Sequence, residues 1–217
     1  MLICENYLLV FLEKWKHEDS FTPGSSESIG LAGAWIMDLI LREKLLIEGK
    51  KLRVIDTDST GDEYIDEILT IIKDSKKIRK LKRWVDLLSK RYNFQNYTVV
   101  LKRLENHGIL KFEEKVTAKI FYKWKYDLIK PEVKQSLLEQ IQNVFIDNLD
   151  PDTELLCLLS LLRISGLINV CISKENRKVA KDRIDDLVRF GNYDPSLLEM
   201  ILKIKKAYRS TLASRSQ

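Results

Sequence analysis

The fold is decided by residues 155–162, which read Leu155-Leu156-Cys157-Leu158-Leu159-Ser160-Leu161-Leu162. Seven of these eight positions are apolar, so a helix formed here has no polar face to turn toward water. Such a helix is buried on most of its sides. Pro151 stands shortly before the run, where a proline commonly opens a helix. The stretch therefore predicts a buried helix that other elements of the chain must cover.

Apolar residues at helical spacing recur on both sides of this run and predict further helices. Ser28 is suited to cap one of them, and Pro131 to open another. Thr60 and Glu63 have the Ser/Thr-x-x-Glu spacing of a capping box, which would start a helix at residues 61–62. The predicted helices span residues 4–15, 28–45, 61–72, 81–88, 96–106, 131–145, 175–190 and 195–209. Helices therefore dominate the predicted fold.

Two pairs of alternating segments predict β-hairpins. Their strands would be residues 45–48 and 52–55 for the first hairpin, and 109–113 and 120–126 for the second. Gly49-Lys50 would form the turn of the first hairpin, and residues 114–119 the tip of the second. These short strands add little to a chain that is otherwise helical.

The domain organisation follows from the lack of breaks in this pattern. Neither an internal repeat nor a long linker divides the sequence, and only four prolines and eight glycines are present. We therefore expect a mainly α fold, a single compact helical domain with two short β-hairpins. The domain would cover residues 1–209, and residues 210–217 would form a flexible C-terminal tail.

Residues suited to catalysis or metal binding are scattered. The chain of 217 residues contains three cysteines, Cys4, Cys157 and Cys171, without a CxxC pair, and two histidines, His17 and His107. This pattern favours buried thiols in a reducing compartment over a disulfide framework or a zinc site. The sequence lacks the nucleophile-elbow, P-loop and dinucleotide motifs. We therefore predict a protein that is not an enzyme and has neither metal nor cofactor.

Three carboxylates near the start of one predicted helix invite a metal or acid–base interpretation. Asp62 and Asp66 share a helix face, and Glu67 lies beside them. Acidic residues in a first helical turn, however, favour the helix dipole and cap its amides. We interpret the three as helix-capping residues.

The sequence contains no stretch of about 18 apolar residues, the length needed to span a bilayer. The apolar N-terminal run is interrupted by Glu5 and lacks a basic start, which argues against a secretory signal. Contact with a membrane would therefore be peripheral.

Positive charge is concentrated in one segment. Residues 73–91 contain nine lysines and arginines against Asp74 and Asp86, a net charge of +7, whereas the whole chain carries +5. Focused positive charge indicates a surface that meets polyanions. The alternative is a lysine-rich helix face that is simply solvated.

Six groups of short motifs follow one another along the chain. They are Gly30-Leu31-Ala32-Gly33 with Asp38-Leu39 and Leu41-Arg42, Thr60-Gly61-Asp62 with Asp66-Glu67, Trp84-Val85-Asp86-Leu87-Leu88-Ser89, Leu104-Glu105-Asn106-His107-Gly108-Ile109-Leu110, Val133-Lys134-Gln135-Ser136-Leu137 with Asp150-Pro151, and Ala180-Lys181-Asp182-Arg183-Ile184. In type and order they resemble motifs of the Golgi phosphoprotein 3 family. The resemblance covers roughly residues 5–190 and is sharpest at residues 60–67. It suggests a prokaryotic or divergent member.

The resemblance implies a non-catalytic helical protein with a basic face that docks on anionic membrane. Eukaryotic members bind phosphatidylinositol 4-phosphate and act as adaptors in membrane trafficking, retaining glycosyltransferases in the Golgi. By analogy we expect a cytoplasmic protein, peripheral on the cytosolic face of a membrane, which would be the Golgi in a eukaryote. Its expected partners are anionic lipid and membrane-protein cargo.

The family's lipid pocket is not matched. Its three arginines fall at Ala32 and near Phe94 and Tyr97, and its tryptophan falls in the loop at residues 21–23, which has none. Because arginine holds a phosphate through a two-pronged contact, loss of all three argues against selective phosphoinositide binding.

Other basic residues then become the candidates for binding lipid headgroups. They are Lys90, Arg91, Lys102, Arg103, Lys119, Lys123 and Lys125. Lys90 and Arg91 lie shortly before two of the unmatched pocket positions, although the same pair would also suit the end of a helix. We expect residues 76–91 and the hairpin lysines to act on one face.

Aromatic and basic side chains alternate along the second strand of the second hairpin. Lys123 and Lys125 would share one face, which suits a lipid interface. Trp124 and Tyr126 would share the other, which would join the core or form a homo-oligomer contact.

Nucleic-acid binding is the alternative function. The helix at residues 96–106, its glycine stop and the following hairpin resemble a winged helix. Lys102 and Arg103 would then lie on the recognition helix, and Lys119 on the wing. The order of the other motifs favours lipid.

Overall fold

The computed structural model describes residues 1–15, 23–91, 95–117 and 121–215. The helices and strands of this described part are α1 Ile3–Glu13, α2 Ser25–Leu41, β1 Leu45–Glu48, β2 Lys51–Val54, α3 Glu63–Lys73, α4 Leu81–Arg91, α5 Gln95–Asn106, β3 Leu110–Thr117, β4 Phe121–Leu128, α6 Pro131–Ile146, α7 Thr153–Ser165, α8 Ile168–Cys171, α9 Arg177–Phe190 and α10 Pro195–Ala213. This composition confirms the predicted mainly α fold with two β-hairpins.

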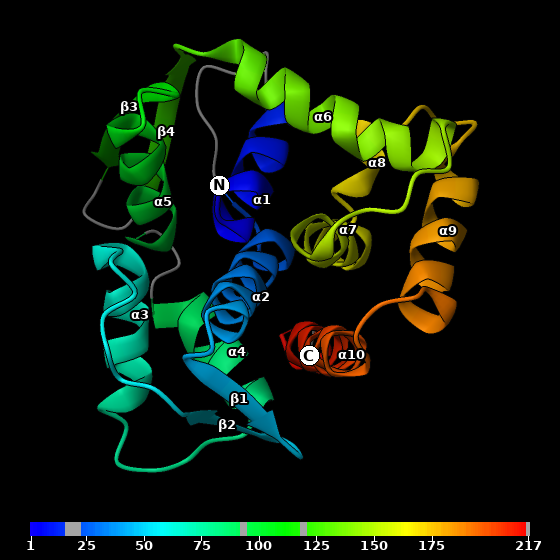
Figure 1. Cartoon of the computed structure of the whole chain (residues 1–217). Coiled ribbons are helices and arrows are strands. Elements are labelled where there is room, and N and C mark those ends of the chain that lie inside the picture. The colour runs from blue at the N-terminus through cyan, green and yellow to red at the C-terminus, as the bar shows by residue number, and fades with distance from the viewer. Residues whose placement is uncertain (16–22, 92–94, 118–120, 216–217) are drawn as a thin grey trace.

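Helix α7 lies near the centre of the molecule, as its apolar sequence predicts. Every side chain from Leu156 to Leu162 is buried, and the helix contacts α1, α2, α9 and α10 (Figure 1). The helix begins at Thr153, two residues later than expected, because Asp152 caps it by accepting a hydrogen bond from the amide of Leu155 (2.8 Å). Pro151 therefore precedes the cap instead of opening the helix.

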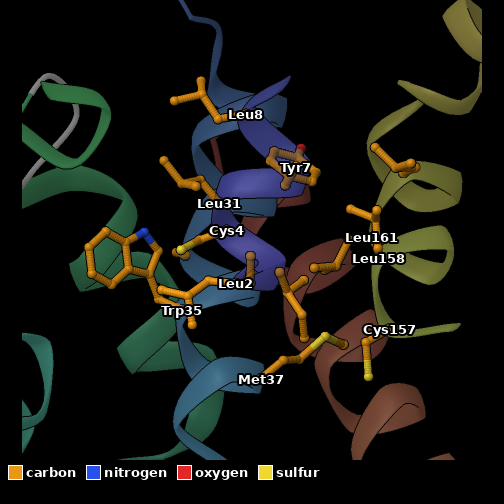
Figure 2. Close-up of a cluster of buried hydrophobic side chains, with 14 of the residues drawn as sticks. Leu2, Cys4, Tyr7, Leu8, Leu31, Trp35, Met37, Cys157, Leu158 and Leu161 are labelled. Atoms are coloured by element: carbon orange, nitrogen blue, oxygen red, sulfur yellow. The ribbon is translucent and has the colours of Figure 1, made fainter. Parts of the chain in front are cut away.

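Two glycines of the Gly30-Leu31-Ala32-Gly33 motif allow helices to pack closely on α2. A Cβ atom on Gly30 would lie 2.0 Å from the hydroxyl oxygen of Tyr7, which belongs to α1. A Cβ atom on Gly33 would lie 3.0 Å from a methyl carbon of Leu161 in α7. Figure 2 shows Tyr7 and Leu161 among the buried side chains around Leu31. The motif is therefore explained by packing in the core.

The acidic residue of the same helix also serves the core. Asp38 of α2 caps the N-terminus of α1, because its carboxylate accepts hydrogen bonds from the amides of Ile3 (2.9 Å) and Cys4 (3.0 Å). Burial raises the pKa of Asp38 to about 6, although these amides oppose the shift. The pair of helices α1 and α2 is thus joined by a carboxylate as well as by apolar contacts.

Two predicted helix caps are wrong. Helix α2 begins at Ser25, and the hydroxyl of Ser28 donates to the carbonyl of Gly24 (2.9 Å) from within the first turn. Helix α3 is capped by Asp62, whose carboxylate accepts from the amides of Tyr64 and Ile65 (both 3.2 Å). An aspartate reaches these amides as readily as Thr60 would, and the sequence pattern alone does not choose between them.

The first hairpin is confirmed closely, with Glu48 opposite Lys51 and a turn at Gly49, whose φ is +58°. The second hairpin is longer than predicted. Strands β3 and β4 pair from Leu110 opposite Leu128 to Thr117 opposite Phe121, so residues 114–117 belong to a strand instead of the tip. The rest of the predicted tip, residues 118–120, lies outside the described residues.

The C-terminal segment differs from the predicted tail. Helix α10 continues to Ala213, and Thr211 is buried. Beyond the helix, the guanidinium of Arg215 donates to the hydroxyl of Ser89 in α4 (2.7 Å). Contacts with a distant helix order this segment, which local sequence could not show. The short helix α8 was also not predicted.

Candidate functional site

The basic segment lies partly in the loop after α3 and partly on α4. Helix α4 is amphipathic: Trp84, Val85 and Leu88 are buried, and the lysines of the segment are exposed. The exposed lysines are Lys73, Lys76, Lys77, Lys80, Lys82 and Lys90. The charge concentrated in this part of the sequence is therefore available to a partner.

Lys90 is exposed but not free. Its ammonium lies 3.1 Å from a carboxylate oxygen of Asp86, which also pairs with Arg83 (3.0 Å) and Arg215 (3.4 Å). Burial favours a higher pKa for Asp86, yet Lys90 and Arg215 outweigh it and hold that pKa below the usual value. Arg91 ends α4, and the structure does not describe its side chain. Lys90 is therefore a weaker lipid-binding candidate than its exposure alone implies.

Arg103 does not belong to an exposed binding surface, which corrects the prediction. Its Nε donates to Glu5 Oε1 (2.8 Å), and a second nitrogen pairs with Asp62. Glu5 is fully buried, and its other oxygen accepts from the amide of Leu2 (2.7 Å). His107 Nδ1 lies 3.2 Å from Glu5 Oε1. Arg103 therefore compensates a buried carboxylate and holds α5 against α1 and α3.

A signal for this network was present in the sequence. Glu5 stands inside the apolar run of α1, where an acidic side chain needs a cationic partner. The sequence did not indicate which of the many lysines and arginines would supply it. Neighbouring Lys102 is exposed on α5, so one member of the predicted pair stays a candidate.

The two faces of β4 separate as predicted where the structure describes them. Trp124 is fully buried, and its Nε1 donates to the hydroxyl of Thr98 (3.3 Å). The hydroxyl of Tyr126 donates to the carbonyl of Leu12 (2.9 Å). Lys125 is exposed and pairs in register with Glu113. The aromatic face of the hairpin is therefore part of this chain's own core at these two residues.

The remaining hairpin candidates cannot be placed in the same way. Lys123 lies opposite Lys115 in the backbone register, and its side chain is outside the described part of the chain. Lys119 lies outside the described residues altogether. That the hairpin lysines act on one face with residues 76–91 therefore stays a prediction.

Two of the three unmatched pocket positions are in the core. Ala32 and Tyr97 are both buried, and the ring of Tyr97 lies against Phe11 and Trp124, with centroids 5.7 and 6.1 Å away. Phe94 is outside the described residues. Neither Ala32 nor Tyr97 offers a cationic group to a ligand.

Of the three carboxylates at the start of α3, Asp62 acts as the capping interpretation predicts, whereas Asp66 binds the loop before the helix. Asp62 caps the helix, and Asp66 accepts hydrogen bonds from the amide (2.8 Å) and hydroxyl (2.7 Å) of Thr60. Burial opposes the shift, but the hydroxyls of Ser59 and Thr60 and the amide of Thr60 keep the pKa of Asp66 below its usual value. These bonds explain why the Thr60-Gly61-Asp62 motif is followed by Asp66.

The thiols and helices carry two further findings. Cys4, Cys157 and Cys171 are buried and free, as predicted, and burial raises the pKa of each thiol. Within the described part of the chain, no helix is both long and apolar enough to cross a bilayer.

Comparison with known families places most of the chain in one of them. Residues 4–204 match the family model described as Golgi phosphoprotein 3 (GPP34). The match takes in α1 through most of α10, and thus all six groups of motifs.

Proposed function

Since this chain belongs to the Golgi phosphoprotein 3 (GPP34) family, we propose that it is a non-catalytic, peripheral membrane protein that binds anionic phospholipid. In this role it acts as a trafficking or retention adaptor at the cytosolic face of a membrane, with membrane-protein cargo as its second partner. The observation that carries the proposal is the exposure of six lysines between residues 73 and 90, in a chain whose net charge is only +5.

Lysines near an anionic bilayer are attracted by its surface potential, each contributing about 1 kcal/mol, and salt screens that attraction. Of the original candidates, Lys102 and Lys125 are exposed and remain part of the proposed contact, and Lys90 contributes despite its pairing with Asp86. Arg103 is excluded by its bonds to Glu5 and Asp62. The candidates therefore supply diffuse positive charge instead of a pocket.

A diffuse surface responds to charge density and discriminates poorly between headgroups. The buried side chains of Ala32 and Tyr97 supply no cation for a single phosphomonoester. We therefore expect binding to depend on the total negative charge of the bilayer, with little preference for phosphatidylinositol 4-phosphate.

Vesicle sedimentation tests this proposal. The protein should sediment with phosphatidylcholine vesicles that contain phosphatidylserine, stay in solution with phosphatidylcholine alone, and be released by high salt. Vesicles with phosphatidylinositol 4-phosphate at matched charge should bind within about threefold of the phosphatidylserine vesicles. Equal sedimentation with neutral and anionic vesicles would contradict the proposal.

The ion pairs of Arg103 argue against the alternative function, nucleic-acid binding. The described elements do include a helix followed by a hairpin, α5 with β3 and β4. However, Arg103 on that helix faces Glu5 and Asp62, so it is not available to a phosphate backbone. A duplex-DNA mobility shift at the same salt concentration provides the comparison.

Homo-oligomerisation through the β3–β4 hairpin is a separate part of the proposal. Trp124 and Tyr126 are already used inside the chain, so such a contact would need other residues of the hairpin.

A further inference from the structure

The loop between α3 and α4 is joined to the β1–β2 hairpin by backbone hydrogen bonds. The amide of Leu52 donates to the carbonyl of Arg79 (3.1 Å), and the amide of Leu81 donates to the carbonyl of Lys50 (2.8 Å). Between them, Lys51 and Lys80 form an antiparallel bridge. In Figure 1 the loop runs along β2, at the edge of the molecule away from β3 and β4. Two basic stretches of the sequence thus become one surface, which we call the β2-loop surface (residues 48–55 and 73–80).

Positive charge on the β2-loop surface is not compensated. Residues 48–53 and 73–80 contain eight lysines and arginines but only Glu48 and Asp74 as acids. Glu48 is engaged by Arg53 (2.9 Å). Six lysines are exposed and form no ion pair with any described residue: Lys50, Lys51, Lys73, Lys76, Lys77 and Lys80.

The bridge between Lys51 and Lys80 places two of these positive charges directly opposite each other. Residues directly opposite each other in an antiparallel pair have neighbouring side chains, and like charges there destabilise the pairing. The opposing pair is therefore unfavourable in the free protein. An anionic partner that covers both ammonium groups would remove the repulsion.

Apolar side chains are exposed within the same surface. Ile55 and Ile78 are 55% and 57% exposed, and both border a shallow hollow of about 260 Å³ whose lining includes Lys77 and Trp84. Aliphatic groups surrounded by lysines gain from entering a medium that is apolar below and anionic at its surface.

The two arginines of the β2-loop surface already contact other residues of the chain. Their contacts limit the kind of anion that this surface can bind. Arg53 pairs with Glu48, while Arg79 donates to the hydroxyl of Ser75 (3.2 Å) and lies over the ring of Trp84 (5.9 Å). Each guanidinium is thus partly occupied within the chain, and the six exposed lysines act as separate point charges. Spaced phosphates suit them, as in a bilayer or a nucleic acid. The exposed isoleucines favour the bilayer, because a sugar–phosphate backbone offers them no apolar medium.

We propose that the β2-loop surface is the principal face on which this protein contacts an anionic bilayer, with its lysines at the headgroups and Ile78 inserted among them. This inference rests on the proposed function and names its contact surface. It places the main contact on β2 and the loop, apart from the β3–β4 hairpin.

The test compares two matched lysine pairs. Lys76→Ala/Lys77→Ala removes two charges from the β2-loop surface. Lys174→Ala/Lys178→Ala removes two exposed charges just before α9 and in its first turn, and α9 lies on the other side of Figure 1. Partition onto phosphatidylserine-containing vesicles should fall about thirtyfold for the first pair. It should fall less than threefold for the control pair, since those lysines would lie beyond a Debye length of about 8 Å from the headgroups.

Ile78→Ser tests insertion without changing the charge of the surface. It should lower partition about tenfold, whereas Val179→Ser, at an exposed position on α9, should change it little. Thermal melts of all variants should match the unchanged protein within a few degrees, because the substituted side chains are exposed.

The outcomes separate this inference from the proposed function. If the unchanged protein fails to bind anionic vesicles, the proposed function is wrong. If the protein binds and both lysine pairs have the same effect, the β2-loop surface is overturned as the contact. A Lys76→Ala/Lys77→Ala variant that loses duplex DNA binding but keeps vesicle binding would also overturn it, in favour of nucleic acid.

Discussion

The two β-hairpins of this protein differ in where they send their side chains. The β3–β4 hairpin buries Trp124 against α5 and fixes Tyr126 to the carbonyl of Leu12, and Lys125 is placed opposite Glu113. The β1–β2 hairpin buries Leu45 and Leu52 and leaves the rest of its short strands at the surface or only partly covered. One hairpin closes the core, and the other carries exposed lysines that pair with no carboxylate among the described residues. The same local structure thus supports stability in one place and offers a binding surface in another.

The largest expected effect comes from emptying the core side of the β3–β4 hairpin. Trp124→Ala should lower the free energy of unfolding by about 4 kcal/mol, because a large buried ring is replaced by a cavity. Leu46→Ala on β1 should cost less than about 0.5 kcal/mol, because Leu46 is 48% exposed. Urea unfolding measures both. Similar losses for the two variants would remove the distinction between the hairpins.

The second largest effect concerns helix α5, which packs against the β3–β4 hairpin. Arg103→Ala should lower the free energy of unfolding by about 3 kcal/mol, because the buried carboxylate of Glu5 would lose its arginine partner. Lys102→Ala, one residue earlier and exposed, should have almost no effect on stability. Among molecules that remain folded, Lys102→Ala should weaken vesicle binding more than Arg103→Ala does. A stable Arg103→Ala variant with weakened vesicle binding would return Arg103 to the binding surface.

The smallest expected effects come from two substitutions that each reverse one charge, one near each hairpin. Lys80→Glu places opposite charges across the bridge with Lys51 and should raise stability by about 0.5 kcal/mol, while it weakens vesicle binding. Lys125→Glu places like charges opposite Glu113 and should lower stability by about the same amount. Chemical unfolding together with vesicle sedimentation resolves the two. If Lys80→Glu destabilised the protein, the lysine pair would not be the strained element that we describe.

Much of the fold was predictable because the helices are local structures with clear apolar periodicity. The apolar run at residues 155–162 predicts the central helix α7, Pro131 begins α6, and Gly49 lies in the turn of the first hairpin. Helix caps were less predictable, since Thr60 and Asp62 are both good capping residues two positions apart. The length of β3 was underestimated, because three of the residues 114–117 (Glu114, Lys115 and Thr117) are charged or polar, which suits a loop as well as a strand.

The candidate site was predictable only in outline. The sequence by itself determined that positive charge gathers between residues 73 and 91, and the exposed lysines of the structure agree with it. It could not assign a role to each lysine and arginine, because the sequence does not show which carboxylate lies next to each of them in the fold. Lys102 and Arg103 are neighbours, yet only the tertiary structure shows that one faces solvent and the other a buried glutamate 98 positions away.

The sequence alone therefore determined the longer helices, both hairpins and the resemblance to the Golgi phosphoprotein 3 family, because each depends on residues close together in the chain or on their order. The tertiary structure decided which basic residues stabilise the fold and which stay exposed. It also joined Lys51 to Lys80 across two separate segments and attached Arg215 to α4. These contacts arise when distant segments pack, and their energies depend on distance and burial, which no local pattern records.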